Sequence, residues 1–410
     1  MQRYVPRMAD EVLASMIRDH PAIAVTGPRA SGKTTTAARH AATTIALGLP
    51  PTASAFAADP GTALSGRPEP VLVDEWQLVP DTLAAVKDLV DADPRPGRFL
   101  LTGSARADLD VATWPGTGRL VGLRMYGLTE REIDGRIGGP AWLTRVAAGD
   151  VPEPGPSPDD LRGYVGRALG SGFPEARLRQ DGDGRIRWLT SYVDQLVTRD
   201  AIDAAPGRDP VRLRRFLEAF TINSGGVVDD ATLFQAAGIN RVTAQAYESL
   251  LAGLFVIDRL PAWTSNRLKR MVQSPKRFVV DPALFTGVLG VTVEDVLSDG
   301  DLLGRVLETW AVAQIRAEAE TLVPRPRLHH LRTAGGRQEI DLVVEFGARR
   351  LCAIEIKATS NPTRQDARHL RWFRTEFGTA VTAAVLLHTG KHTFEIDEGV
   401  IATPLASLWS

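Results

Sequence analysis

The sequence predicts an α/β protein in which an N-terminal parallel sheet is followed by a helical middle region and a second α/β domain. Three observations predict this fold class. A short apolar run, a glycine-rich loop and a helix-forming segment follow one another between Ala22 and Ala42. Two more short apolar runs end in polar residues, at 71–75 and 99–104, and two strand-like segments lie near the C-terminus, at 337–347 and 350–360. Such alternation of strands and helices is typical of an open, mainly parallel sheet flanked by helices.

The composition is that of an ordinary globular protein. The 410 residues are 44% hydrophobic and 24% charged, and the net charge of −1 excludes a uniformly basic nucleic-acid-binding protein. The single cysteine, Cys352, excludes a disulfide framework and a multi-cysteine zinc site. Because we find no signal-peptide core and no apolar run long enough to span a bilayer, we expect a cytoplasmic protein without a membrane partner. The length predicts two or three domains.

A helix at 5–20 and a buried strand at 22–25 lead into the glycine-rich loop. Gly27 to Thr34 fits G-x-x-x-x-G-K-[ST], the P-loop pattern, in which Lys33 reaches the β and γ phosphates of ATP and Thr34 binds Mg2+. Only six of the 48 Lys+Arg residues are lysines, so a chance match is about a one-in-a-hundred event. The alternative is an ordinary glycine-rich turn before a helix. The predicted nucleotide-binding residues are Gly27, Pro28, Arg29, Ala30, Ser31, Gly32, Lys33, Thr34 and Thr35.

The next elements supply a candidate acidic pair. A strand near 44–47 and a short helix near 53–58 are predicted before the apolar run 71–73, which ends in Asp74 and Glu75, as in a Walker B element. Asp74 is expected to bind the Mg2+ shell through water, and Glu75 to orient or deprotonate the attacking water. The alternative is a strand followed by a solvated acidic turn. The P-loop upstream favours the catalytic interpretation.

A helix at 81–90, with Asp81 as its N-cap, is predicted before another strand within 97–106. Ser104 lies at the tip of that strand and is a candidate sensor of the γ-phosphate or of the attacking water; a simple strand-end turn explains it equally well. Arg119 precedes a further strand. It is either a γ-phosphate sensor or, the interpretation we favour, a surface arginine.

These motifs resemble those of a known family. GPRASGKT, VLVDEWQ and FLLTGS together resemble bacterial ATP-binding proteins of the AAA type that carry a C-terminal region called domain of unknown function 4143. The resemblance extends to GSGFPEA, RWLTSYVDQLVTRD, SPKRFVVDPAL and IEIKAT, and so covers most of the chain. It implies an ATP-binding domain at the N-terminus, with ATP and Mg2+ as cofactors.

The middle of the chain predicts a linker and a winged helix-turn-helix. Four prolines fall within 151–160, the clearest linker in the chain. Two helices joined at Gly238 and followed by a strand are typical of a winged helix. The segment Arg259 to Arg277 is rich in basic residues and has no acidic one, so it is a candidate DNA contact. The alternative is a solvated hairpin. The helices and the strand are predicted at 213–220, 229–237, 240–252 and 254–260.

The C-terminal region carries a second constellation of charged residues. Glu355 and Lys357 are two apart on a predicted strand, so both side chains leave the same face, and Asp341 lies on the preceding strand. With Glu308 on the preceding helix, this resembles the PD-(D/E)xK nuclease core. In that core, two carboxylates hold Mg2+ and a lysine orients or activates water. The resemblance implies that Asp341 and Glu355 are the carboxylates in this chain and that Lys357 is the lysine. A generic hairpin with a solvated E-x-K face is the alternative. A helix at 364–377 and a strand at 381–387 are predicted to follow.

Three functional hypotheses remain. The first is an ATP-hydrolysing switch that controls the C-terminal module, the second a Mg2+-dependent DNA nuclease, and the third an interaction protein in which ATP only locks a conformation. A homo-oligomer, in which a second copy could supply an arginine to the P-loop, is a further hypothesis. The predicted domains are a P-loop ATPase domain (1–150), a linker and helical connector (151–210), a winged helix-like region (211–285) and a restriction-endonuclease-like domain (286–410).

Overall fold

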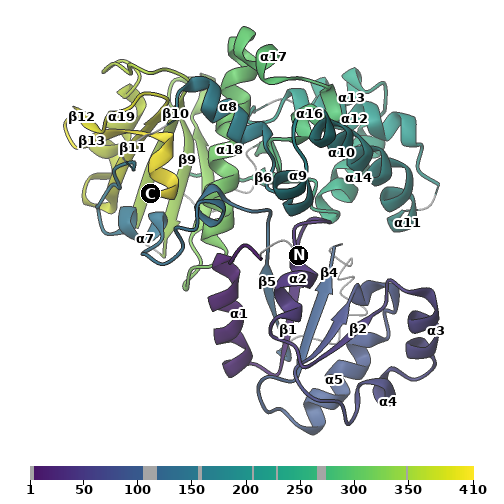
Figure 1. Ribbon diagram of the computed structural model, residues 1–410. Coiled ribbons are helices and arrows are strands. Elements are labelled where there is room, and N and C mark those ends of the chain that lie inside the picture. The colour runs from purple at the N-terminus through teal and green to yellow at the C-terminus, as the bar shows by residue number, and fades with distance from the viewer. Residues whose placement is uncertain are drawn as a thin grey trace. The chain divides into compact units, whose positions relative to one another are not determined.

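The computed structural model divides into two compact units (Figure 1). One comprises Pro6–Gly127 and Leu251–Phe255, and the other comprises Met1–Val5, Leu128–Leu250 and Val256–Ser410. The structure describes residues 4–104, 118–155, 159–205, 207–227, 230–265, 274–347 and 350–410. Among these described residues, no helix combines the length and the apolar character needed to cross a membrane.

The first unit is built on a parallel sheet of five strands in the order β2-β3-β4-β1-β5. All five run in the same direction, so their carboxyl ends share one edge of the sheet. The loop after β1 and the acidic residues after β3 therefore lie at the same edge, as the sequence predicts. The strands are β1 (Ala22–Thr26), β2 (Thr43–Ala46), β3 (Val71–Asp74), β4 (Phe99–Gly103) and β5 (Leu120–Arg124).

Helices cover both faces of this sheet because alternate strand residues point to opposite sides. Val71 and Val73 pack in one cluster with Phe56, whereas Leu72 packs in another cluster with Leu13. The expected N-cap Asp81 precedes α5, but its side chain makes no capping hydrogen bond. The helices are α1 (Met8–Asp19), α2 (Lys33–Ala38), α3 (Pro50–Ala58), α4 (Pro60–Leu64), the 3-10 turn η1 (Trp76–Leu78) and α5 (Thr82–Ala92).

The second unit begins with a mainly helical part. Its helices are α6 (Glu130–Ile133), α7 (Trp142–Ala147), α8 (Leu161–Leu169), α9 (Pro174–Arg179), α10 (Gly182–Gln195), the π-helix η2 (Leu196–Asp200), α11 (Ala201–Ala204), α12 (Pro210–Ile222), α13 (Asp230–Ala236), α14 (Arg241–Gly253), α16 (Leu284–Leu289) and α17 (Val293–Ser298). Strands β6 (Ile257–Leu260) and β7 (Lys276–Val279) pair antiparallel after α14. Helices α12, α13 and α14 precede this pair of strands in the chain.

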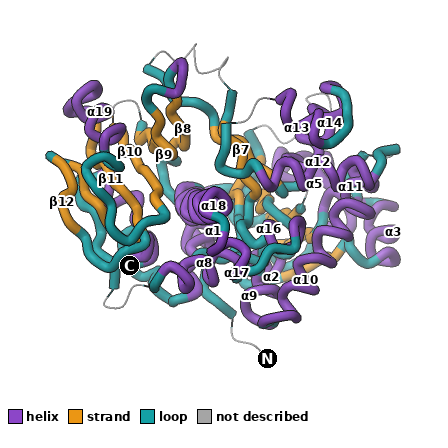
Figure 2. Tube along the Cα trace, turned by 90° about the horizontal axis from the view of Figure 1, so that it is seen from above, coloured by secondary structure: helices purple, strands orange, loops and turns teal. Residues whose placement is uncertain are grey.

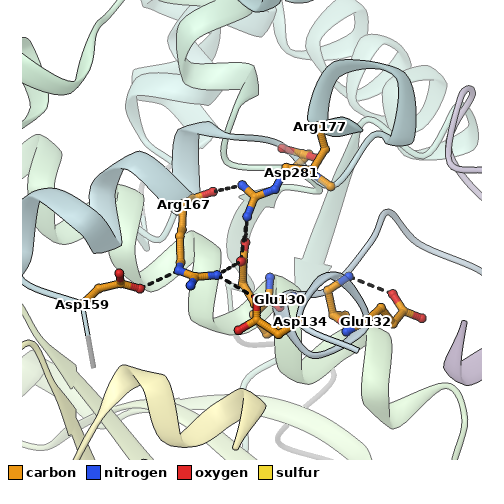
Figure 3. A network of polar contacts seen from close by, with 10 residues as sticks. Glu130, Glu132, Asp134, Asp159, Arg167, Arg177 and Asp281 are labelled. Carbon is orange, nitrogen blue, oxygen red and sulfur yellow. Dashed lines mark hydrogen bonds and ion pairs between the residues drawn. The ribbon is translucent and has the colours of Figure 1, made fainter. Parts of the chain in front are cut away.

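A buried ion network ties several of these helices together (Figure 3). The Glu130 carboxylate lies 2.6 Å from Arg167 Nη1 and 2.7 Å from Arg177 Nη2. Burial raises the pKa of Glu130, and the two arginines oppose that rise. Asp281 is also buried and accepts hydrogen bonds from the Ser171 hydroxyl and from two backbone N–H groups. The network thus joins α6, α8 and α9.

The C-terminal part is a mixed sheet of six strands in the order β12-β13-β11-β10-β9-β8. β8, β9 and β10 pair antiparallel, and β10, β11 and β13 pair parallel. Helix α18 contacts β10, and α19 packs into a core with β9 and β11 (Figure 2). The elements are α18 (Gly300–Ala319), β8 (Arg327–Arg332), the turn η3 (Ala334–Gly336), β9 (Glu339–Phe346), β10 (Arg350–Lys357), α19 (Arg368–Phe377), η4 (Gly378–Ala380), β11 (Val381–His388), β12 (Phe394–Asp397), β13 (Val400–Pro404) and η5 (Leu405–Trp409).

Candidate functional site

The loop between β1 and α2 has a backbone that requires glycine. Gly27 has φ 151°, and a Cβ atom built on it would lie 2.0 Å from the carbonyl oxygen of Met125. Gly32, just before α2, has φ 94°, in the left-handed region that other residues avoid. Ala30 also has a positive φ, of 59°. The loop therefore folds back on itself between strand and helix, which is the shape that surrounds a phosphate group with backbone N–H groups.

Lys33 is buried at the start of α2, with 5% of its surface exposed. Its Nζ donates hydrogen bonds to the carbonyl oxygens of Gly27 at 3.0 Å and of Pro28 at 2.7 Å. Burial lowers the pKa of Lys33 to about 8, although the carboxylates of Glu75 and Asp74 oppose that shift. The ammonium is thus held against the loop, where it can exchange its carbonyl partners for phosphate oxygens.

Thr34 and Asp74 meet at the carboxyl edge of the sheet. The Thr34 hydroxyl donates to Asp74 Oδ1 at 2.6 Å, and the Thr102 hydroxyl donates to the same oxygen at 2.5 Å. Hydroxyl and carboxylate oxygens of this kind are ligands that Mg2+ prefers, usually with waters and phosphate oxygens completing the shell. The pair therefore fits a nucleotide-bound Mg2+, held by Thr34 and, through water, by Asp74.

Glu75 follows Asp74 and has φ 56°, in the left-handed region. The chain therefore turns sharply at Glu75, and the side chains of Asp74 and Glu75 point in different directions. Its Oε2 accepts hydrogen bonds from the Ser104 hydroxyl at 3.2 Å and from the Gln77 amide. The Ser104 hydroxyl in turn accepts from Arg29 Nε at 3.3 Å. Two residues predicted separately, Ser104 and Glu75, thus belong to one hydrogen-bonded chain that begins in the loop. Gln77 is not among the predicted site residues, although it ends the segment VLVDEWQ that carries part of the resemblance.

Arg7 is a site residue that the sequence motifs do not reveal. It is 4% exposed, and its guanidinium donates to the carbonyl oxygens of Ser31 at 2.9 Å, Tyr126 at 2.8 Å and Gly127 at 3.0 Å. Arg7 therefore fixes the backbone of the loop to the segment after β5. Within the described residues the buried hydroxyl of Ser31 has no hydrogen-bond partner, so it is free to meet a bound group.

Arg119 takes no part in this site. It precedes β5, which runs parallel to β1 with Leu120 opposite Ala22, so Arg119 lies at the edge of the sheet where the strands begin. Its Nε lies 2.7 Å from Asp91 Oδ1 in an exposed ion pair. The γ-phosphate sensor alternative is therefore wrong, because the loop lies at the opposite edge.

The C-terminal constellation comes together around an unpredicted lysine. Lys276 Nζ lies 2.6 Å from Glu308 Oε1 and 3.0 Å from Asp341 Oδ1. On β10, Lys357 Nζ lies 3.0 Å from Glu355 Oε2. The same-face placement of Glu355 and Lys357 and the pairing of β9 with β10 agree with the sequence analysis.

The carboxyl groups of this cluster have strongly altered proton affinities. Burial raises the pKa of Glu308 to about 8, against the attraction of Lys276. Burial also raises the pKa of Glu355 well above its usual range. Burial alone would also raise the pKa of Asp341. The nearby ammonium groups of Lys276 and Lys357 outweigh that effect and hold the pKa of Asp341 at about 2.

Mg2+ fits this cluster poorly in the observed arrangement. The ammonium of Lys276 stands between two of the predicted acidic residues, where it would repel a divalent cation. In the part of the chain that the structure describes, no three side chains of the His, Cys, Asp and Glu types are arranged to hold a metal ion.

The described basic residues of the segment Arg259 to Arg277, the candidate DNA contact, pair with carboxylates of the protein itself. Lys276 and Arg277 are 2% and 4% exposed. Arg277 Nε lies 3.1 Å from the Glu248 carboxylate, and Arg259 Nε lies 2.7 Å from it. Lys276 and Arg277 are therefore held inside the protein, whereas the side chain of Arg259 is about half exposed. The others in the segment, Arg267, Lys269 and Arg270, lie outside the described residues.

Comparison with known protein families gives three separate matches along the chain. A family model described as an AAA domain matches residues 19–134, and models of domains of unknown function match residues 162–295 (DUF8612) and 303–408 (DUF4143). An AAA domain at the N-terminus and a DUF4143 region at the C-terminus confirm the resemblance read from the sequence motifs.

Similar whole chains are also known. Uncharacterised proteins of Mycobacterium bovis and Mycobacterium tuberculosis are each 28% identical to this chain over 388 residues, which is 94% of this chain and 80% of theirs. A solved structure, a Walker-type ATPase of Pyrococcus abyssi, has a TM-score of 0.43 and 13% identity, covering 70% of this chain and 96% of that one.

Proposed function

We propose that this chain, with an AAA domain at its N-terminus and a DUF4143 region at its C-terminus, is an ATP-hydrolysing switch whose nucleotide state controls the C-terminal module. The observation that carries the proposal is the convergence of Lys33, Thr34, Asp74 and Glu75 at one edge of a parallel sheet. These groups are the charge-neutralising, metal-binding and water-orienting parts that phosphoryl transfer to water needs.

The roles follow from the contacts. Lys33 and the N–H groups of the loop would bind the phosphates, while Thr34 and Asp74 would hold the Mg2+ that neutralises their charge. Glu75, fixed by Ser104 and the Gln77 amide, would orient the attacking water and accept its proton. Arg29, which donates to Ser104, connects this water-binding end to the loop itself.

Nucleotide binding is tested by Lys33→Ala. We expect ATP affinity measured by calorimetry with Mg2+ to fall by at least 100-fold, about 2.7 kcal/mol, because a buried charge-assisted contact to phosphate is lost. Lys87→Ala is the matched control, since Lys87 is a surface lysine of the same unit that pairs with Asp88 and Asp91. Unchanged ATP affinity in Lys33→Ala would contradict the proposal.

A Mg2+-dependent DNA nuclease is the second candidate function. Its support is the order α18, β8, β9, β10, α19, β11, which places Asp341, Glu355 and Lys357 on two paired strands as in the PD-(D/E)xK core. Lys276 argues against it, so we favour a nuclease-like fold used for binding. Incubation of plasmid with the wild type and with Lys357→Ala separates the two: cleavage by the wild type alone would establish the nuclease.

A winged helix remains the proposed form of the middle region. It is supported by α13 and α14, joined at Gly238 with φ 64°, and by the hairpin of β6 and β7 that follows. Duplex DNA is its candidate ligand. Fluorescence anisotropy of a labelled duplex, titrated at two salt concentrations, tests this, and anisotropy that does not change with protein at low salt counts against DNA binding.

A further inference from the structure

A lysine from the middle region is buried inside the acidic cluster of the C-terminal sheet. Lys276 is the first residue of β7, and 3% of its side chain is exposed. Its Nζ lies 2.6 Å from Glu308 Oε1, on α18, and 3.0 Å from Asp341 Oδ1, on β9. One ammonium therefore bridges two carboxylates that come from two different elements.

The two carboxylates on β9 and β10 differ in how fully their oxygens are paired. Asp341 Oδ2 accepts a hydrogen bond from the backbone N–H of Ile356 at 3.0 Å, so both of its oxygens have partners. Glu355 Oε2 lies 3.0 Å from Lys357 Nζ, while Glu355 Oε1 is buried without a hydrogen-bond partner among the described residues. A buried carboxylate oxygen without a partner, close to the Asp341 carboxylate, needs a nearby positive charge.

The charge of the cluster explains why a cation is needed. Three buried carboxylates cannot remain ionised together without compensation, because each repels the others in a medium of low dielectric constant. Lys276 and Lys357 each place an ammonium group beside these carboxyl groups, and Lys276 supplies its charge from the interior. A Mg2+ ion would do the same through oxygens at about 2.0 to 2.1 Å, which requires the space that the ammonium fills.

We propose that the ammonium of Lys276 is the resident cation of this cluster, standing between Glu308 and Asp341 in place of a divalent metal. The wild-type cluster then binds no divalent metal, and removal of the ammonium leaves Glu308 and Asp341 facing one point, where they can bind Mg2+ or Mn2+ together with water molecules. This inference does not depend on the proposed ATPase function, because none of its residues belongs to the nucleotide site.

The competing explanation is that Lys276 only stabilises the packing of β7 against α18 and β9 through its two ion pairs. Both explanations predict that loss of Lys276 lowers stability, since two buried carboxylates lose their partner. Only the resident-cation proposal predicts that the variant gains a metal ion. Metal binding is therefore the measurement that separates them.

The experiment uses the full chain without nucleotide, in an Asp74→Asn background that removes a predicted metal ligand of the nucleotide site. Mn2+ is titrated, and the free ion is measured by its electron paramagnetic resonance signal. We expect the background chain to bind no Mn2+ below 1 mM, and Lys276→Met to bind one equivalent at least tenfold more tightly than that limit. Lys276→Arg, which keeps the charge, should bind none.

Further variants tie the result to the cluster. Adding Asp341→Asn to Lys276→Met should abolish the new site, and 1 mM Mn2+ should raise the melting temperature of Lys276→Met but not of the background chain. A folded Lys276→Met that binds no Mn2+ would overturn the proposal. If that variant does not fold, the background chain decides: one equivalent of Mn2+, lost on Glu355→Gln, would overturn the proposal, and no binding would support it.

Discussion

Glu75 is held in a backbone conformation that non-glycine residues rarely adopt, with φ 56° and its carboxylate bonded to Ser104. Such positions are often found where a side chain must be aimed at one point. Under the proposed function, that point is the attacking water.

Glu75→Gln should separate ATP binding from hydrolysis. Gln keeps the size of the side chain but cannot accept a proton at neutral pH, so we expect phosphate release to fall by about 100- to 10,000-fold. ATP affinity should change by less than about threefold, because the phosphates and Mg2+ are bound by other residues. A phosphate-release assay and calorimetry measure the two quantities, with Asp88→Asn, on the exposed side of α5, as the control. If the wild type releases no phosphate, ATP only locks a conformation.

For single residues, the sequence predicts groups whose members are close together in the chain. It does not predict groups whose members are far apart in the chain. Lys33 and Thr34 are fixed by a pattern of eight consecutive residues. Arg7 reaches Tyr126 across 119 positions, and Lys276 reaches Asp341 across 65, so no spacing rule can connect them. A buried cation with a distant partner is visible only once the chain is folded.

At the level of secondary-structure elements, the network around Glu130 joins three short helices, α6, α8 and α9. The longest of them has nine residues. Helices of this length have little stability of their own in water. Their placement therefore depends on tertiary contacts such as this network.

Glu130→Ala should destabilise the second unit strongly. Removing the carboxylate leaves Arg167 and Arg177 partly buried without this shared partner, which costs about 3–5 kcal/mol in the free energy of unfolding. Glu175→Ala, which breaks the exposed pair with Arg179, should cost less than about 1 kcal/mol. Urea unfolding followed by circular dichroism measures both. Equal effects of the two substitutions would contradict a structural role for the network.

The predictability of elements follows their hydrophobic patterns. β1 and β3 are short apolar runs, and the sequence predicts them at nearly their observed positions. β8 reads Arg-Leu-His-His-Leu-Arg, and the sequence does not predict it, because its apolar residues neither alternate nor form a run. β12, at the other edge of the same sheet, is not predicted either, although Phe394 and Ile396 alternate with acidic residues over its four positions. Edge strands are buried on fewer sides and so leave a weaker signal.

On the scale of the whole molecule, the division into two units makes the switch proposal testable. A ligand that binds only the folded form stabilises it by about 2.7 kcal/mol at a concentration of 100 times its Kd. ATP with Mg2+ should therefore raise the melting temperature of the unit that contains the P-loop. Scanning calorimetry should show a second transition, of the C-terminal unit, that also moves if the nucleotide controls it. Lys33→Ala should abolish both shifts, and a shift confined to one transition would contradict control.

The contacts of Arg7 have a consequence for cutting the chain into fragments. The AAA family model begins at residue 19, and a fragment expressed from there would look complete by its motifs. It would lack the guanidinium that pairs with the carbonyl oxygens of Ser31, Tyr126 and Gly127, and also α1, which packs against the sheet. The smallest piece that retains a properly shaped phosphate loop therefore has to begin before Arg7, twelve residues upstream of the start of the family match.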